Sequence, residues 1–304
     1  MRWQTIVLLI FLFTSCHRTN RDEGLSIFKY NESNGISNLD PAFAKDKASI
    51  WAISQIFNSL VKINKDLKVA PAIAKRWEIS DDGRSYIFYL RDSIFFHDHE
   101  FFEDNKGRMV VASDFTYSFS RLLDADLASP GSWVLNNVSN FYHENDSIFV
   151  INLKDPFPPF LSLLSMQYCS VVPREIADSS IFRSNPIGTG PFKFQYWKEG
   201  VKLILRKNNN YFELENNVRL PYLDAISITF IKDKQSEFLS FLQGDIHFIS
   251  GLDQSYKDEI LNLDGTLRMK YRKEIQMESA PFLNTEYLGF LMDGESEISN
   301  NLSL

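Results

Sequence analysis

Two cysteines in 304 residues limit how this chain can be held together. Cys16 follows Arg2, an apolar run at residues 6–13 and two small residues, which is the order found in a secretory signal. The eight residues of that run are too few to span a bilayer. Apart from Cys16, the exported chain retains Cys169 alone, and a lone thiol cannot build a disulfide framework. Its stability must come from a packed core, for which 44% apolar and 14% aromatic residues are sufficient.

A cysteine directly after such a signal resembles the lipobox of bacterial lipoproteins, although Phe13 stands where that pattern prefers leucine. The resemblance implies that residues 1–15 are a removed signal peptide and that Cys16 carries lipid, with residues 16–24 as a short polar tether. We expect an exported protein, lipid-anchored to a membrane on the periplasmic or extracytoplasmic side, because several acyl chains hold a soluble domain stably on a bilayer. The alternative is an ordinary signal peptide followed by a chance cysteine.

The charge of the chain is acidic and evenly distributed along the sequence. The formal net charge is −7, and the loss of Arg2 with the signal leaves −8 for the mature chain. No run of basic residues suggests contact with nucleic acid, so we expect none.

Apolar spacing predicts a mixture of helices and strands. Apolar residues at helical spacing predict a helix over 50–60, and Ser113 or Asp114 is placed to cap a second helix. Asp82 and Gly83 lie between two extended runs, which is a strong hairpin signal. Further strands are predicted at residues 25–30, 146–153, 200–206 and 225–231, with a short helix at 236–242 that ends at Gly244. Because strands and helices do not alternate strictly, the predicted class is mixed α/β, in the sense of α+β.

The segment at residues 95–104 is a candidate metal site, because His97 and His99 would share one face of a strand. The acidic residues around them are Asp98, Glu100, Glu103 and Asp104. A zinc site needs three or four ligands in a tetrahedral arrangement, and the other histidines, at positions 17, 143 and 247, lie far away in the sequence. We therefore expect no metal ligands here.

No catalytic constellation is present in the sequence. The G-x-S-x-G and H-E-x-x-H patterns are absent, and the "GTGPF" at residues 188–192 lacks the Lys-Ser/Thr of a phosphate loop. We expect Gly188 and Gly190 to permit tight backbone turns, with a structural role. The sequence thus predicts no enzyme and no cofactor.

Several landmarks stand in one order along the chain. They are "SNLDPAFA", "APAIAKRWEISDDGRSYIFYLR" with "FFHD", "VVASDFTYSFSRLLDADLASP", "VVPRE", "NPIGTGPFKF", "RKNNNYF", "LPYLDAISITFI" and "LQGDIHFI". This series resembles the extracytoplasmic solute-binding proteins of family 5, the receptors of peptide and nickel importers of the ABC class. In that family the position of His99 is a glycine, which indicates a different turn here.

The resemblance implies a lobe like those of type II periplasmic binding proteins, with an inserted subdomain. The first lobe would use residues 25–57 and 174–276, the insertion residues 58–173, and residues 277–304 would begin a second large lobe that is largely missing. Since one wall of a pocket buries little of a ligand, we expect this chain to bind peptides poorly.

The function implied by the resemblance is capture of short peptides and their delivery to an ABC permease, which a separate ATPase subunit drives. We expect a monomer. The ligand-binding positions implied by the family pattern are Ala44, Lys45, Asp46, Lys47, Gly131, Ser132, Trp133 and Tyr287. Two alternatives remain open: a receptor for nickel or a metal chelate, and a lipid-anchored interaction protein without transport.

Overall fold

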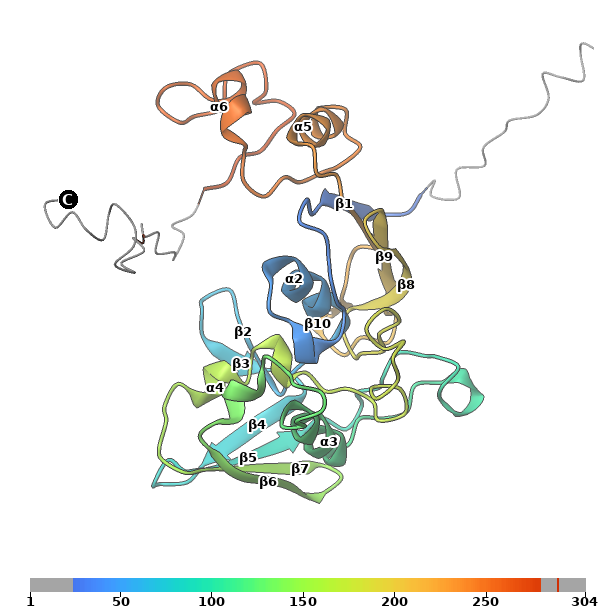
Figure 1. The fold of residues 1–304 in the computed structure, drawn as a ribbon, viewed down its shortest axis with the longest axis vertical. Helices are drawn as coiled ribbons and strands as arrows, with labels where there is room; N and C mark the ends of the chain where they lie inside the picture. The colour runs from blue at the N-terminus through green and yellow to red at the C-terminus, as the bar shows by residue number, and fades with distance from the viewer. Residues whose placement is uncertain (1–23, 280–288, 290–304) are drawn as a thin grey trace, which may run out of the picture. The chain divides into compact units, whose positions relative to one another are not determined.

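A computed structural model of the chain describes residues 24–279 and Gly289. These residues belong to two compact units, the first ending at Ser250 and the second starting at Gly251 (Figure 1). Two predicted functional positions, Cys16 and Tyr287, lie outside the described residues. The predicted mixed α/β class is confirmed for the described residues.

The first unit contains a four-stranded sheet, here called the first sheet, with strand order β1-β12-β9-β8. Its strands are β1 (Ile27–Asn31), β12 (Ala225–Thr229), β9 (Lys202–Lys207) and β8 (Phe192–Lys198). β1 and β12 are parallel, and the other neighbours are antiparallel. Leu203 and Leu205 are fully buried on one face of β9, as period-two alternation requires when only one face meets the core.

Helix α2 (Lys47–Ile56) supplies apolar side chains to the core beside the first sheet. The Asp46 carboxylate caps the helix by accepting the Ser49 backbone N–H at 2.9 Å. The helix ends where Phe57 adopts extended backbone angles, φ −123° and ψ 161°. The predicted helix over 50–60 was therefore right in kind but displaced by three to four residues at each end.

A second sheet in the same unit has strand order β4-β5-β7-β6, with every pair antiparallel. Its strands are β4 (Ala74–Ile79), β5 (Ser85–Leu90), β7 (Ile148–Leu153) and β6 (Val138–Asn145). The predicted hairpin joins β4 and β5, and Gly83 takes the positive φ of +67° that its turn requires.

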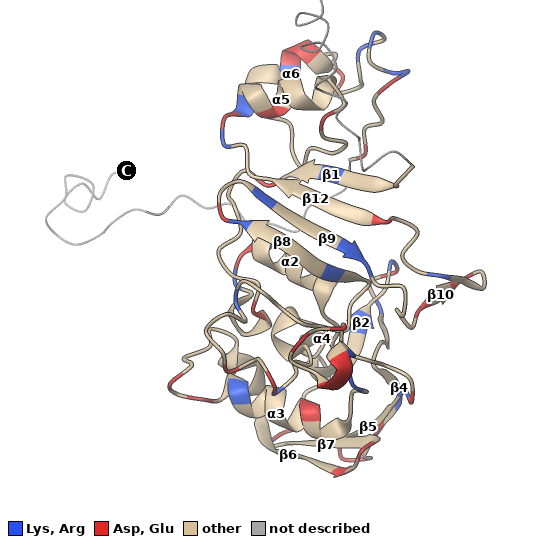
Figure 2. Ribbon diagram, turned by 90° about the vertical axis from the view of Figure 1, so that its right-hand side faces the viewer, with Lys and Arg blue, Asp and Glu red and all other residues tan. Residues whose placement is uncertain are grey.

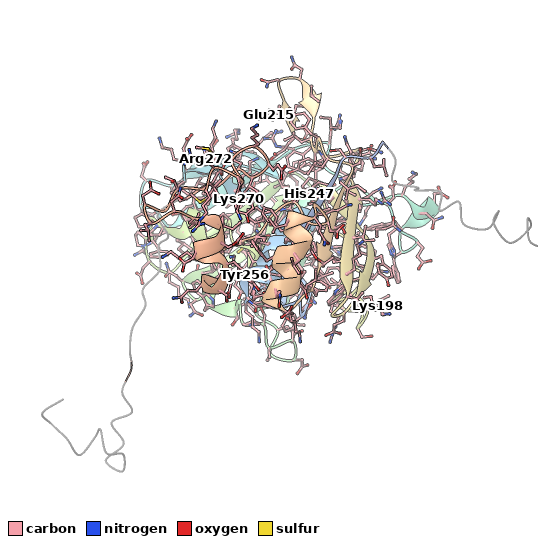
Figure 3. The ribbon with its side chains drawn as sticks, turned by 90° about the horizontal axis from the view of Figure 1, so that it is seen from above. Lys198, Glu215, His247, Tyr256, Lys270 and Arg272 are labelled. Atoms are coloured by element: carbon pink, nitrogen blue, oxygen red, sulfur yellow. The ribbon has the colours of Figure 1, made fainter. Side chains whose placement is uncertain are left out.

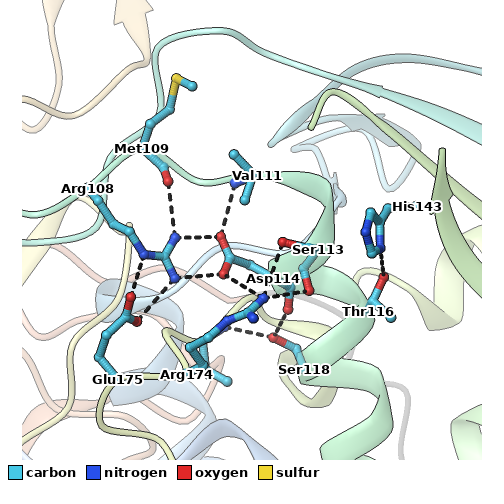
Figure 4. Close-up of polar contacts among 11 residues, drawn as sticks. Arg108, Met109, Val111, Ser113, Asp114, Thr116, Ser118, His143, Arg174 and Glu175 are labelled. Carbon is cyan, nitrogen blue, oxygen red and sulfur yellow. Dashed lines mark hydrogen bonds and ion pairs between the residues drawn. The ribbon is translucent and has the colours of Figure 1, made fainter. Parts of the chain in front are cut away.

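Helix α3 (Ala112–Leu122) packs against this second sheet, where Phe119 meets Phe149 edge to face. Figure 4 shows how its first turn is held. The buried Asp114 accepts the Val111 N–H at 3.0 Å and two N–H groups of Arg108, each at 2.8 Å, while Arg108 also binds Glu175. The prediction that Ser113 or Asp114 caps this helix is confirmed for Asp114, but its carboxylate caps from inside the first turn, since the N-cap position is Val111.

One hydrophobic core contains residues of both sheets. The remaining elements of the first unit are β2 (Val61–Ile63), β3 (Val69–Pro71), β10 (Leu214–Glu215), β11 (Val218–Arg219), α4 (Phe160–Leu163), α5 (Lys234–Leu242), and the 3-10 turns η2 (Pro41–Phe43), η3 (Glu103–Asn105), η4 (Ser132–Leu135) and η5 (Gln167–Cys169). None of the helices in residues 24–279 combines the length and the apolar character that a membrane crossing requires.

The second unit contains α6 (Gln254–Ile260), whose N-cap is Asp253. After the helix, Lys270, which is labelled in Figure 3, donates to the Glu259 carboxylate at 2.6 Å, and Tyr271 donates to the same carboxylate at 2.7 Å. These contacts hold the segment around Lys270 and Tyr271 against α6.

Candidate functional site

A cavity of about 510 Å³ lies where β1, α2 and α5 end or begin. Its lining is polar and comes from four separate parts of the first unit: Asn31, Glu32, Ser33, Asn34, Gly35, Ser37, Asp46, Lys47, Ala48, Lys234, Glu237 and Ser250. We call it the polar cavity. Its volume lies within the range of about 300–1,000 Å³ that small-molecule sites occupy.

One wall of the polar cavity is a chain of hydrogen bonds between the end of β1 and α5. The Asn31 amide donates to Glu237 at 2.8 Å and to the Ile231 carbonyl at 2.9 Å. Lys234 then donates to Glu237 at 2.7 Å and to Ser33 at 3.1 Å. Glu237 is only 5% exposed, so both of its oxygens are satisfied as burial of a charge demands.

The start of α2 also lines the polar cavity. Lys47 donates from Nζ to the Ser250 hydroxyl at 3.1 Å, and the same ammonium lies 4.3 Å from the ring centre of Trp51. A hydrogen bond and a cation–π contact together restrict a side chain that would otherwise be flexible. The Lys47 side chain is therefore held in place in the cavity lining.

The polar cavity carries both signs of charge. Burial raises the pKa of Glu32 above its usual range, and the nearby Glu237 adds to the increase, whereas the Asn34 N–H and the ammonium groups of Lys47 and Lys234 oppose it. Glu32, in the loop after β1, and Lys47, at the start of α2, thus line the same space. This pairing suits a ligand with separate cationic and anionic ends.

A second hollow of about 430 Å³, here called the apolar hollow, lies between α2 and the first sheet. Its lining is mostly aromatic and aliphatic: Phe28, Tyr30, Trp51, Ser54, Gln55, Phe192, Leu223, Ile226 and Phe248. Trp51 lines this hollow while its ring contacts Lys47 of the polar cavity. One cation–π contact therefore links a residue that lines the polar cavity with a residue that lines the apolar hollow.

Of the predicted ligand-binding residues in the described part, Asp46 and Lys47 line the polar cavity. Ala44 is 1% exposed and belongs to the core, and Lys45 is exposed but is not part of the lining.

The segment with Gly131, Ser132 and Trp133 lies beside the turn before α2, because Ser129 donates to the Ala42 carbonyl at 2.6 Å. Gly131 packs so closely on Tyr168 that a Cβ atom would stand 2.2 Å from that ring. Ser132 is half-buried, and Trp133 is 46% exposed. Neither lines the polar cavity.

Sequence patterns did not indicate five of the lining residues: Asn31, Glu32, Lys234, Glu237 and Ser250. Two of them lie at the end of β1 and the other three lie about 200 residues later, in α5 and after it. The two groups meet because β1 pairs with β12, which leads directly into α5. A pairing between such distant strands leaves no local signal that sequence periodicity could detect.

His97 is a structural residue in the folded chain. Its ring is buried, donates from Nε2 to the Gly190 carbonyl at 2.9 Å and accepts the Gly188 N–H at Nδ1. Within the described residues no group of three or more His, Cys, Asp or Glu side chains is arranged to hold a metal ion. Gly188 and Gly190 are required by close approach, since a Cβ atom would lie 2.0 Å from the Ile56 oxygen and 2.5 Å from the Ile56 carbonyl carbon respectively.

The chain that carries this site is similar to known proteins. A sequence model described as bacterial extracellular solute-binding proteins, family 5, middle region, matches residues 68–301. Heme-binding protein A of Haemophilus influenzae is 28% identical over 283 residues, which are 86% of this chain and 49% of that protein. The dipeptide-binding protein of Escherichia coli is 26% identical over 254 residues, which are 77% of this chain and 44% of that protein.

Solved structures show the same fold. The ABC transporter-associated periplasmic binding protein DppA of Helicobacter pylori, in complex with the peptide STSA, superposes with a TM-score of 0.70 at 26% identity, covering 79% of this chain and 50% of that chain. NikZ of Campylobacter jejuni, in complex with Ni(L-His), gives a TM-score of 0.62 at 25% identity, covering 73% and 42%. The chain thus spans about half the length of the relatives it matches.

Proposed function

Because the chain belongs to the bacterial extracellular solute-binding proteins of family 5, we propose that it captures short peptides outside the cytoplasmic membrane as the substrate-binding part of an ABC importer. The observation that carries this proposal is the polar cavity, with Glu32, Lys47, Lys234 and Glu237 around one space. A dipeptide-binding relative and a peptide-bound structure of the same fold support it.

The polar cavity matches the chemistry of a short peptide. A free peptide carries an ammonium at one end and a carboxylate at the other, and the cavity offers carboxylates and ammonium groups. Lys47 and Lys234 attract the carboxylate, and Glu32 attracts the ammonium. The apolar hollow beyond Trp51 accommodates an apolar side chain.

The strength of binding follows from how much of the peptide this chain encloses. The chain spans about half the length of its relatives, and we propose that it supplies one wall of their site. A ligand held on one side keeps much of its surface in water. We therefore expect a dissociation constant near 1 mM, or about −4 kcal/mol, rather than the micromolar value of an enclosed site.

The test is a titration of the mature chain with trialanine, followed by two-dimensional NMR of the backbone amides. We expect shifts at residues 32–37 and 46–48, and weaker shifts with the same peptide acetylated and amidated at its ends. Lys47→Ala should weaken binding, whereas Lys75→Ala, which removes an exposed lysine outside the cavity, should not. Shifts confined to other segments, or equal shifts for the blocked peptide, would contradict the proposal.

We also propose an oligomeric state, a membrane anchor and transporter partners for the chain. The chain is a monomer that is anchored through lipid on Cys16, and it passes its peptide to a permease driven by a separate ATPase, without catalysis by this chain. Labelled palmitate should be incorporated in a bacterial host and should be absent from Cys16→Ser.

The proposed domain limits are residues 25–57 and 174–276 for the first lobe, 58–173 for the insertion and 277–304 for the start of a second lobe. Two observations support them: the strands of the first sheet come from the first set of ranges, and the strands of the second sheet come from the insertion. Trp133 and Tyr287 remain proposed contacts of the peptide.

A further inference from the structure

The face of the first sheet that is turned away from the buried leucines of β9 carries a set of basic residues. In β9 the side chains of Leu203 and Leu205 point into the core, so Lys202 and Arg206 point to the other face. The strand register adds three more basic residues to that face. We call the set Lys29, Lys193, Lys198, Lys202 and Arg206 the basic face.

The basic face contains two like-charge pairs directly across neighbouring strands. Lys193 lies opposite Arg206, and Lys198 lies opposite Lys202 beside the turn that joins β8 to β9. Lys198 is labelled in Figure 3. Directly opposed like charges destabilise a sheet. Because two such pairs lie on one face, a negatively charged partner would relieve the repulsion in both.

No carboxylate within the described residues forms an ion pair with these charges. The four strands themselves contain no Asp or Glu, and Figure 2 shows the blue basic positions along β1, β8 and β9. None of the five basic side chains makes a hydrogen bond or ion pair with another residue in 24–279. The charge of Lys193 reaches Asp98, but Asp98 already binds Lys106 at 3.2 Å.

The basic face is set on a protein that is acidic as a whole, with a net charge of −7. Its positive charge is therefore a local property of one sheet surface. Lys29 and Lys198 are exposed, and Tyr196, which lies between the basic residues of β8, is 46% exposed. Exposed tyrosine among lysines is typical of surfaces that meet the headgroup region of a bilayer.

We propose that the basic face docks onto an anionic lipid bilayer. This inference uses the lipid anchor proposed for Cys16, because only eleven positions separate that residue from Ile27, the first residue of β1. Fully extended, they reach at most about 40 Å. An anchored chain therefore keeps the first sheet close to the membrane, where each basic residue near an anionic surface contributes to binding.

The experiment measures sedimentation of the mature chain with lipid vesicles, using Cys16→Ser so that no acyl chain contributes. One set of vesicles is phosphatidylcholine alone, and the other is an equal mixture of phosphatidylcholine and phosphatidylglycerol. We expect binding to the mixed vesicles only, and release when salt is raised from about 0.1 M to about 1 M, since the screening length falls from about 10 Å to about 3 Å.

The variant Lys202→Gln with Arg206→Gln removes two charges of the basic face and should weaken binding roughly 25-fold, at about fivefold per charge. The control Lys65→Gln with Lys68→Gln changes the net charge equally at exposed positions in and beside the turn between β2 and β3, and should bind like the parent. Circular dichroism checks that each variant is folded.

Binding to both kinds of vesicle, to neither, or an equal loss in the control would overturn the proposal. The peptide titration separates this inference from the proposed function, because Lys202 and Arg206 do not line the polar cavity. A Lys202→Gln, Arg206→Gln variant that loses the vesicles should keep its response to trialanine.

Discussion

The Arg121 guanidinium contacts both carboxylate oxygens of Asp40, at 2.9 and 2.6 Å, and both side chains are buried. Arg121 belongs to α3, whereas Asp40 begins the turn that leads to Asp46 and the polar cavity. Arg121 also donates to the Ala177 carbonyl at 2.9 Å. Arg121, 81 positions further along the chain, therefore holds in place the segment that leads to the polar cavity.

Arg121→Ala should lower the free energy of unfolding by about 3–5 kcal/mol, because it leaves the Asp40 carboxylate buried without its partner. Urea denaturation followed by circular dichroism measures the change. Arg76→Ala is the matched control, since its ion pair with Glu78 is exposed to water and should contribute little to stability. Equal losses in the two variants would show that the buried pair has no special role.

Acid should destabilise the chain through His97. Burial lowers the pKa of His97 to about 4 in the folded chain, against about 6.5 when unfolded. The unfolded chain therefore takes up the proton first, and stability present above about pH 6.5 is lost as the pH falls through 4. The loss attributable to this residue is at most about 3 kcal/mol.

The variant His97→Gln removes the titration, so its free energy of unfolding should change less than the parent's between these pH values. The variant His143→Gln, at an exposed position, should keep the slope of the parent. A His97→Gln curve parallel to the parent would exclude His97 as the source.

Gly190→Ala should destabilise the chain by about 3 kcal/mol, because the new Cβ would stand 2.5 Å from the backbone carbon of Ile56, where nothing flexible can yield. Gly200→Ala is the control, since no atom lies within 4 Å of its Cβ and only the φ of +68° is strained. That strain costs about 1–2 kcal/mol. Thermal unfolding monitored for both variants distinguishes close approach from backbone conformation.

Cys169 should resist thiol reagents in the folded chain. Its side chain is fully buried, and burial raises the pKa of the thiol to about 12, which suppresses the reactive thiolate. In the Cys16→Ser chain, a colorimetric thiol reagent should react only after addition of guanidinium. Adding an exposed thiol by Ser147→Cys should restore rapid reaction without denaturant, and rapid reaction of Cys169 itself would contradict its burial.

Local patterns predicted the parts of the fold that local chemistry determines. The turn at Gly83 was found because a residue with positive φ must be favoured there, and α5 was found because Gly244, at φ +76°, follows its last turn. β8 was not predicted as a strand. A bulge between Phe194 and Tyr196 interrupts the alternation that reveals a strand.

Both proposed binding surfaces depend on contacts that the sequence conceals. Glu32 and Glu237 meet at the polar cavity only after distant strands pair. Likewise, Lys29 and Lys202 are separated by most of the chain and form no basic run, yet the register places them on one sheet face. Strand register is a tertiary property, and a shift of one residue would turn these side chains inward.

The parallel pairing of β1 with β12 joins segments 198 positions apart, from Ile27 with Ala225 to Asn31 with Thr229. For a chain that is threaded through a translocation channel amino terminus first, β1 emerges early and has no neighbour on this side until Thr229 has crossed. Such late closure slows folding, since a long loop must be ordered before its contacts form. In the export proposed above, this delay leaves β1 without its partner strand while the rest of the chain crosses.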